Sequence, residues 1–296
     1  MPLPLFRDSH IQTRSTLHSH SLSKVGAVIA IAAGKGGVGK STVAVNLALA
    51  LSELGFRVGI MDTDIYGPSI RKMLPEERLP AQKGKFILPA VCQGISVISM
   101  AYFRKDDEAV AVRGPIANHL IAQFINKVEW GALDFLLIDF PPGTGDVQLT
   151  ICQQARLMGA VMVTTPQEIA LMDVQKAISL FQQVNVPVLG IIENMSFFRS
   201  SSTQEPIYPF GKGGGQHLAT KFAIPLLGKI PLDPQICISG DKGESIFVTD
   251  SQENDSAIVA FRKIAGQIVQ NIERLKREKE GGTRDFELIW QEKIHS

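Results

Sequence analysis

Short apolar runs alternate with amphipathic stretches along most of this 296-residue chain. The first run, 25–33, is apolar and contains several β-branched residues, which predicts a buried strand. The stretch after it predicts a helix that begins near Lys40 and ends by Gly55. The apolar face of that helix comprises Val43, Leu47, Leu51 and Leu54.

The same alternation continues to residue 276 and indicates the fold class. Further strands are expected at 57–61, 135–139, 159–164, 187–193 and 226–230, and further helices at 169–184 and 257–276. Strands that alternate with helices form a parallel sheet covered on both faces. We therefore predict an α/β fold, with one domain at 25–276, a mostly parallel sheet, and a ligand site at the carboxyl ends of the strands.

Residues 75–105 are less regular. Apolar runs at 86–88 and 95–98 flank Gly94 and predict a pair of strands, and a turn is expected at 106–108. Residues 113–115, Arg-Gly-Pro, predict the start of a helix, because proline suits the first helical turn. The apolar face of this helix is expected to hold Ile116, Leu120, Phe124 and Val128.

Charge and cysteine content narrow the function classes. A net charge of +1 gives no electrostatic support for nucleic acid as the main partner. No apolar run of about 18 residues occurs, so we expect no membrane span. The three cysteines (Cys92, Cys152 and Cys237) form no C-x-x-C pair, and their odd number argues against a disulfide framework. A reducing, cytoplasmic setting is expected.

The two ends of the chain differ from the domain between them. Residues 1–24 carry Ser, His and Arg and little acid, a composition similar to that of a transit peptide. They show no clear amphipathic pattern, so we expect a disordered tail there. Residues 277–296 are expected to form a charged tail, whose acidic residues disfavour binding to anionic lipid.

Residues 34–41 fit the pattern G-x-x-x-x-G-K-S/T, the phosphate-binding loop. Glycines let the backbone turn its N–H groups toward an anion, and the following helix N-terminus adds to that site. Lys40 would reach the β- and γ-phosphates, and the Ser41 hydroxyl would ligate Mg²⁺. The alternative is a glycine-rich turn that binds nothing. The residues expected to bind ATP are Gly34, Lys35, Gly36, Gly37, Val38, Gly39, Lys40, Ser41 and Thr42.

Asp62 and Asp64 follow the second predicted strand. Carboxylates at positions i and i+2 of a strand end can face the same side. Beside a phosphate loop, they would act on the Mg²⁺ shell and on the attacking water. The alternative is a turn in which an aspartate caps the helix that starts near Ser69.

Asp139 ends the apolar strand 135–139, as in the Walker B arrangement, and would hold Mg²⁺ through water. Gly143 and Gly145 allow the loop after it to move and to sense the γ-phosphate. A strand capped by a proline–glycine turn is the alternative. Asn194 and Pro231 also lie at strand ends; an amide there can contact the adenine edge, or can equally cap a loop.

The stretch from Lys35 to Thr42, Lys-Gly-Gly-Val-Gly-Lys-Ser-Thr, resembles the deviant phosphate loop of the MinD/ParA/Mrp class of ATPases. In that class, the extra lysine crosses a dimer interface to the partner's nucleotide. The resemblance implies that Lys35 acts in a nucleotide-dependent homodimer. A solvated loop charge is the alternative for Lys35.

Several further stretches resemble the Mrp family, the bacterial ATPases described as iron–sulfur cluster carriers, and the match covers about 24–272. The resemblance implies slow ATP hydrolysis, with Lys35, Lys40 and Asp64 as catalytic residues and with Mg²⁺ held by Ser41, Asp62 and Asp139. It also implies apo iron–sulfur proteins as recipients. The stretches are 34–42, 62–69, 113–115, 138–150, 193–196, 210–215 and 225–234.

One family feature is absent from this sequence. Family members usually carry a C-x-x-C after the Asn-Met-Ser segment, and two subunits share a 4Fe–4S cluster on four thiolates. Ser200 and Thr203 stand at the corresponding positions here, and hydroxyls do not replace thiolates at such clusters. The cluster ligands are therefore unknown. Cys152 and Cys237 could serve in principle, but structural cysteines are the simpler interpretation.

Three functions remain open from the sequence. The first is a dimeric Mrp-type ATPase that carries iron–sulfur clusters or acts on a partner that holds them. The second is a related ATPase that has lost the cluster and works as a nucleotide-switched scaffold. The third is a positioning ATPase similar to MinD and ParA, bound to membrane or DNA, which the near-neutral charge and the acidic tail disfavour.

Overall fold

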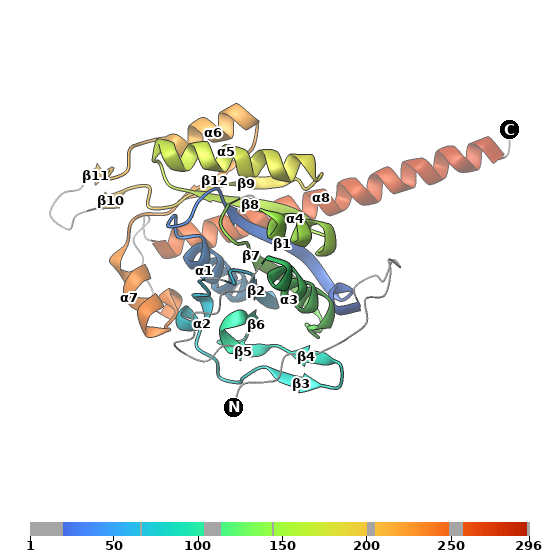
Figure 1. Ribbon diagram of the computed structural model, residues 1–296. Coiled ribbons are helices and arrows are strands. Elements are labelled where there is room, and N and C mark those ends of the chain that lie inside the picture. Colours follow the sequence, from blue (N-terminus) through green and yellow to red (C-terminus); the bar gives the residue numbers. More distant parts are fainter. Residues whose placement is uncertain are drawn as a thin grey trace.

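The computed structural model describes residues 20–65, 67–103, 114–143, 145–199, 205–248 and 257–294. Its centre is an eight-stranded sheet in the order β12-β9-β8-β1-β7-β2-β6-β5 (Figure 1). The strands of this sheet are β1 (Val25–Ala33), β2 (Val58–Asp62), β5 (Ala90–Cys92), β6 (Ile95–Ser99), β7 (Leu133–Asp139), β8 (Gly159–Thr164), β9 (Val188–Glu193) and β12 (Leu226–Lys229). Neighbouring strands are parallel, except that edge strand β5 pairs antiparallel with β6. The predicted α/β fold with a mostly parallel sheet is confirmed.

Helices cover both faces of the sheet. The helices are α1 (Lys40–Glu53), α2 (Ile70–Met73), α3 (Gly114–Lys127), α4 (Asp146–Gln154), α5 (Glu168–Gln183), α6 (Gly214–Phe222), α7 (Pro234–Lys242) and α8 (Ala257–Ile294), with short 3-10 helices η1 (His20–Leu22), η2 (Met100–Tyr102) and η3 (Ile246–Val248). The core on one face is formed with α1 and α8, and the core on the other face with α3, α4, α5 and α6.

The sequence of β1 is apolar without interruption because both faces of this strand are buried. Ile29 and Ile31 pack into the core on the α1 side, whereas Val28 and Ala30 pack into the opposite core. Successive strand side chains point to opposite faces, so a strand buried on both sides needs apolar residues at every position.

The predicted pairing of 86–88 with 95–98 is wrong. Phe86–Leu88 (β4) pairs antiparallel with Ala81–Lys83 (β3), and β6 pairs with β2 and β5. Gln93 and Gly94 both have positive φ, 50° and 76°. Such a two-residue turn joins the strands directly beside it, so the hairpin partner of β6 is β5 rather than the more distant β4.

The expected apolar face of α3 is also wrong at one position. Ile116 is 54% exposed, although Leu120, Phe124 and Val128 are buried as expected. The buried face includes Ala117 and Ile121. Each residue is rotated about 100° around the helix from the one before it, so Ile116 lies outside the face that Ala117 occupies. Likewise, Leu54 is 48% exposed because it follows the last residue of α1.

Several sequence predictions concern the two ends of the chain and residues that the structure does not describe. Residues 1–19, the turn at 106–108, Arg113, Ser200 and Thr203 lie outside the described residues. Residues 277–294, expected as a charged tail, continue helix α8, whose C-terminal part extends beyond the sheet (Figure 1). Among the described residues, no helix combines the length and apolarity that crossing a membrane requires.

Candidate nucleotide-binding site

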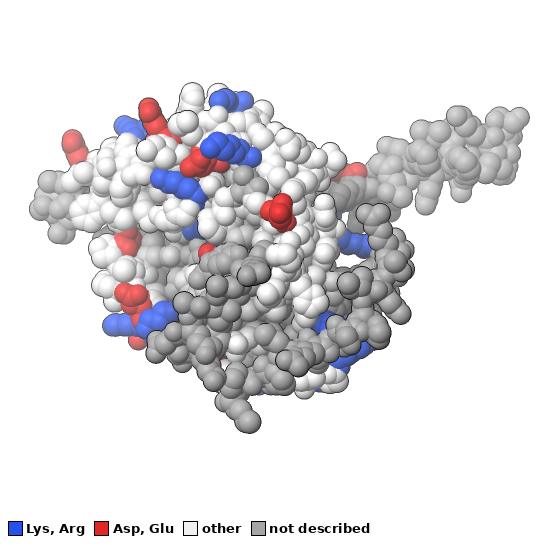
Figure 2. Space-filling model, viewed as in Figure 1, with Lys and Arg blue, Asp and Glu red and all other residues white. Residues whose placement is uncertain are grey.

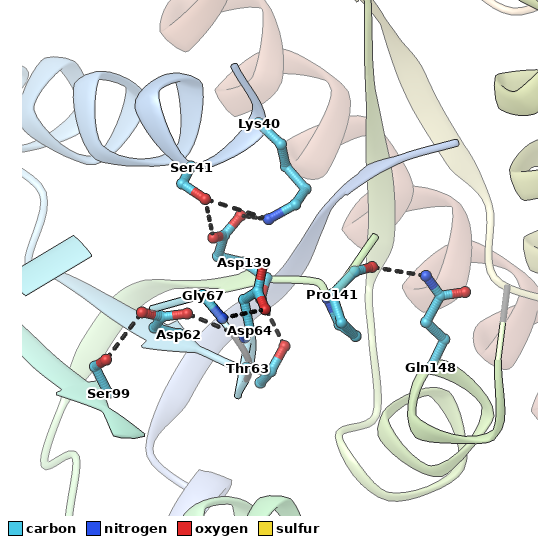
Figure 3. A network of polar contacts seen from close by, with 10 residues as sticks. All are labelled: Lys40, Ser41, Asp62, Thr63, Asp64, Gly67, Ser99, Asp139, Pro141 and Gln148. Carbon is cyan, nitrogen blue, oxygen red and sulfur yellow. Dashed lines mark hydrogen bonds and ion pairs between the residues drawn. The ribbon is translucent and has the colours of Figure 1, made fainter. Parts of the chain in front are cut away.

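The phosphate loop lies between β1 and α1, at the carboxyl ends of three adjacent strands. Asp139 ends β7, the neighbour of β1, and Asp62 ends β2, the next strand along. The two aspartates are direct partners in the register of β2 and β7. Strand order therefore brings residues from three parts of the chain to one edge of the sheet (Figure 3).

Different structural constraints favour glycine at different positions of the phosphate loop. Gly37 and Gly39 adopt φ of 81° and 78°, which disfavours any other residue. A Cβ on Gly34 would lie 2.1 Å from the backbone of Asp173 in α5, and a Cβ on Gly39 would lie 2.4 Å from Asn194 Nδ2. By contrast, Gly36 and Gly37 face open space, which leaves room for a ligand beside the loop.

Lys40 and Ser41 both contact Asp139 (Figure 3). The Lys40 ammonium lies 2.5 Å from Asp139 Oδ1, and the Ser41 hydroxyl donates to Asp139 Oδ2 at 2.6 Å. The Asp139 side chain is 0% exposed and the Lys40 side chain 7% exposed. Helix α1 begins at Lys40 with no side-chain cap, so its first N–H groups are available to an anion.

Asp62 is fixed by two hydrogen bonds. Ser99 Oγ donates to Asp62 Oδ2 at 2.9 Å, and the Asp64 amide donates to Asp62 Oδ1 at 3.0 Å. Burial, then the nearby Asp139 carboxylate, raises the pKa of Asp62 to about 7. Burial also raises the pKa of Asp139, against the opposing effect of Lys40. Two adjacent buried carboxylates thus form a site where an added cation is favourable.

Asp64 lies at the same edge of the sheet and is half-buried. It accepts a hydrogen bond from the Gly67 amide at 3.1 Å (Figure 3). Thr63 lies between Asp62 and Asp64 in the sequence. Its hydroxyl donates to the Asp139 carbonyl at 2.6 Å, and this hydrogen bond joins the ends of β2 and β7.

The arrangement fits a magnesium–nucleotide complex. Ser41, Asp62 and Asp139 supply hard oxygen donors, the kind of ligand that Mg²⁺ prefers. Lys40 and the uncapped start of α1 supply positive charge beside open loop glycines. These residues would hold the metal and the phosphates.

Among the remaining sequence-predicted residues, the structure connects Asn194, Lys35 and Thr42 to the phosphate loop. Asn194 Nδ2 donates to the Val38 carbonyl at 2.9 Å, so its amide contacts the phosphate loop. Lys35 is half-buried in the loop, and Thr42 forms part of the first turn of α1. Pro231 is buried just beyond β12.

Sequence reasoning missed Ser99 and Gln148. Ser99 is a polar residue at the end of the mostly apolar strand β6. It has the same strand-end position that identified Asp62 in the sequence. Gln148 is 3% exposed in α4, and its Nε2 donates to the Pro141 carbonyl at 2.7 Å in the loop after Asp139 (Figure 3). No local pattern indicates this contact, because it depends on how α4 folds back over that loop.

The three cysteines have different surroundings. Cys92 is buried beside the Tyr102 hydroxyl, and burial raises the pKa of its thiol. Cys152 is half-buried, and burial raises its pKa to about 11. Cys237 is exposed on α7. In the described part of the chain, no three His, Cys, Asp or Glu residues gather into a possible metal site.

Together, the mostly parallel sheet, the phosphate loop and the strand-end aspartates define the class of this protein: it is a P-loop NTPase. A family described as ParA: NUBPL iron-transfer P-loop NTPase matches residues 24–269, and the chain belongs to that family.

Relatives and solved structures agree with this assignment. The iron–sulfur cluster carrier protein of Aquifex aeolicus is 44% identical over 248 residues, or 82% of this chain and 68% of that protein. A nucleotide-binding protein from Archaeoglobus fulgidus, solved in complex with ADP, is 40% identical, with a TM-score of 0.67 over 75% of this chain and 88% of that one. The septum site-determining protein MinD of Pyrococcus horikoshii, complexed with Mg-ADP, has a TM-score of 0.60 at 23% identity over 82% and 95% of the two chains, a likeness of fold.

Proposed function

We propose that this chain binds ATP with Mg²⁺, hydrolyses it slowly, and carries iron–sulfur clusters to apo iron–sulfur proteins as a homodimer. The observation that carries the nucleotide part is the meeting of Lys40, Ser41, Asp62 and Asp139 beside open loop glycines. Family membership and the name of the Aquifex relative support the carrier part.

Each site residue has a proposed task. Lys40 neutralises phosphate charge, and Ser41, Asp62 and Asp139 hold Mg²⁺. Asp64 orients the attacking water, and Lys35 reaches the nucleotide of a second subunit. When bound, the metal supplies charge stabilisation at the phosphates. Asn194 and Pro231 are proposed to contact the nucleotide near the loop.

Exposed apolar residues beside the loop support a second copy as the partner. Ile169 and Met172 of α5 are 68% and 62% exposed. They lie within one helical turn of Asp173, against whose backbone Gly34 packs. A dimer interface that covers Ile169 and Met172 would include the helix that Gly34 contacts, one residue before Lys35.

The surface charge gives no support for nucleic acid or anionic membrane as a partner. On the face shown in Figure 2, Lys and Arg are mixed with Asp and Glu among the described residues. The net charge of the whole chain is +1. Polyanion binding requires a concentration of positive charge on one surface. Three free thiols fit the reducing, cytoplasmic setting that we propose.

A specific observation favours a second candidate, a nucleotide-switched scaffold without a cluster. The expected thiolate positions hold Ser200 and Thr203, outside the described residues, and the described residues contain no thiol cluster. Hydroxyls do not replace thiolates at such clusters. Under the carrier proposal, Cys152 or Cys237 would contribute ligands, or a partner would hold the cluster.

Iron and acid-labile sulfide analysis of anaerobically purified and reconstituted protein separates the two candidates. The carrier proposal expects a charge-transfer absorption band and transfer of the cluster to an apo acceptor. A colourless protein that binds ATP and never changes cluster transfer supports the scaffold instead. Failure to bind isotope-labelled ATP contradicts both candidates.

A further inference from the structure

A fully buried carboxylate lies directly beside the nucleotide site and has no task in it. Glu193 ends β9 and is 0% exposed. The next residue, Asn194, donates to the Val38 carbonyl of the phosphate loop at 2.9 Å. Of these two adjacent residues, Asn194 contacts the phosphate loop, whereas Glu193 contacts a separate group of partners.

The partners of Glu193 come from three later segments. Its Oε1 accepts from the Ser196 hydroxyl at 2.5 Å, and its Oε2 accepts from the Gly215 amide at 2.5 Å. The Lys229 ammonium, at the end of β12, lies 3.9 Å from Oε1. A buried charge is costly unless it is paired and hydrogen-bonded, so these contacts constrain where the segments lie.

The Ser196 contact holds the segment that enters β10 (Phe198–Arg199), which pairs with β11 (Pro206–Ile207). Backbone bonds reinforce it: the Ser196 amide donates to the Ile230 carbonyl, and the Leu232 amide to the Phe197 carbonyl. We name residues 196–199 the hairpin arm. It begins at Ser196, which contacts Glu193, and includes β10, one strand of the hairpin formed by β10 and β11.

The Gly215 contact holds the start of α6. The amide is one of the N–H groups that a helix leaves without an internal partner, and Glu193 satisfies it from another strand. A Cβ at Gly215 would lie 3.0 Å from Glu193 Cβ and Oε2, so glycine permits this approach. We name residues 213–216 the helix arm. This contact accounts for the glycine at position 215.

We propose that Asn194 and Glu193 link the phosphate loop to the hairpin arm and the helix arm, with Glu193 as the positioning residue. The inference rests on the proposed nucleotide binding and deepens it. A nucleotide that orders Val38 and Gly39 also restrains the Asn194 side chain bonded to that loop. Glu193, the residue before Asn194 and the last of β9, passes this restraint to both arms. The link is a continuous set of contacts, which coupling between two places in a protein can follow.

Hydrogen exchange of the full chain, measured with and without Mg-ADP, tests the link. In the wild type, Mg-ADP should slow exchange in both arms by about tenfold, the effect expected for restraining a charge-assisted hydrogen bond. Glu193→Ala should abolish the response in both arms. Ser196→Ala should abolish it in the hairpin arm and keep it in the helix arm.

Two further variants distinguish positioning from simple space filling. Glu193→Gln should retain both responses, because its oxygen can accept from Gly215 and its amide can donate to Ser196. Glu193→Leu fills the space without a hydrogen bond and should lose both. Glu168→Ala, a change of an exposed glutamate at the start of α5, is the matched control and should respond as the wild type does.

Calorimetric titration with Mg-ADP is run on every variant, so that binding and coupling are read separately. If the wild type does not bind, the proposed function fails and the inference fails with it. If the wild type binds but neither arm responds, the inference alone is overturned. A wild-type response in Glu193→Ala also overturns it. Should Glu193→Ala not fold, Ser196→Ala decides: equal responses in both of its arms contradict the link.

Discussion

The Lys40 ammonium and the Asp139 carboxylate form a buried ion pair, with 2.5 Å between Nζ and Oδ1. The lysine proposed to hold phosphate is thus paired with the aspartate proposed to hold Mg²⁺. A nucleotide with its metal would give each group a new partner of opposite charge.

We expect Lys40→Ala to weaken nucleotide binding by at least about 30-fold, since losing a buried charged partner costs about 2–5 kcal/mol. The change also leaves the buried Asp139 without its cation, so the free energy of unfolding should fall by about 3 kcal/mol. Titration with labelled ATP and urea unfolding measure the two effects. Binding at wild-type affinity would contradict the assignment of this loop to phosphate.

Lys35→Ala should bind ATP as the wild type does and lose hydrolysis by roughly 10³-fold, the effect typical of a cation supplied in trans. Lys83→Ala, a change of an exposed lysine on β3, is the matched control and should keep full turnover. Mixing Lys35→Ala with Lys40→Ala gives a decisive result. In a mixed dimer, the Lys35→Ala subunit keeps Lys40 and binds ATP, and the Lys40→Ala subunit supplies Lys35 to that nucleotide. Activity should therefore return. A mixture that stays inactive contradicts action in trans.

The sequence was sufficient to place those parts of the candidate site that are local or lie at strand ends. The phosphate loop is contiguous, and the positions of Asp62 and Asp139 were predictable because each lies at the end of an apolar run. The pairing of β4 was wrong, because a short apolar run carries no information about which of two nearby strands it will meet. The contacts of Glu193 with Gly215, and of Gly34 with Asp173, could not be predicted. They require the strand order of the sheet, which no local pattern encodes.

Two loop glycines should respond differently to the same substitution. Gly39→Ala forces a side chain into φ of 78° and within 2.4 Å of Asn194 Nδ2, so the free energy of unfolding should fall by at least about 2 kcal/mol. Gly36→Ala meets no atom within 4 Å and should change it by less than about 0.5 kcal/mol. Urea unfolding of the two variants without nucleotide makes the comparison. Equal destabilisation would contradict the geometry of the loop.

The Arg57–Asp134 ion pair predicts a pH-dependent stability away from the nucleotide site. Arg57 donates to Asp134 through Nε at 3.1 Å and through a terminal guanidinium nitrogen at 2.9 Å, and its backbone amide donates at 2.8 Å. These hydrogen bonds lower the pKa of Asp134 to about 2. The pair joins the residue before β2 to the second residue of β7.

A carboxyl group with a lower pKa in the folded state stabilises the protein above its unfolded pKa, about 4, and this stabilisation is lost as the pH falls toward 2. Asp134→Asn should therefore lower the free energy of unfolding by about 1 kcal/mol at pH 7, a value reduced for solvent screening of this partly exposed pair. The difference from wild type should shrink between pH 4 and pH 3 in urea unfolding. Glu129→Gln removes a more exposed ion pair with Lys83 at 3.3 Å and should have a smaller effect at pH 7. A difference between Asp134→Asn and wild type that stays constant from pH 7 to pH 3 would show that Arg57 does not stabilise the ionised carboxylate.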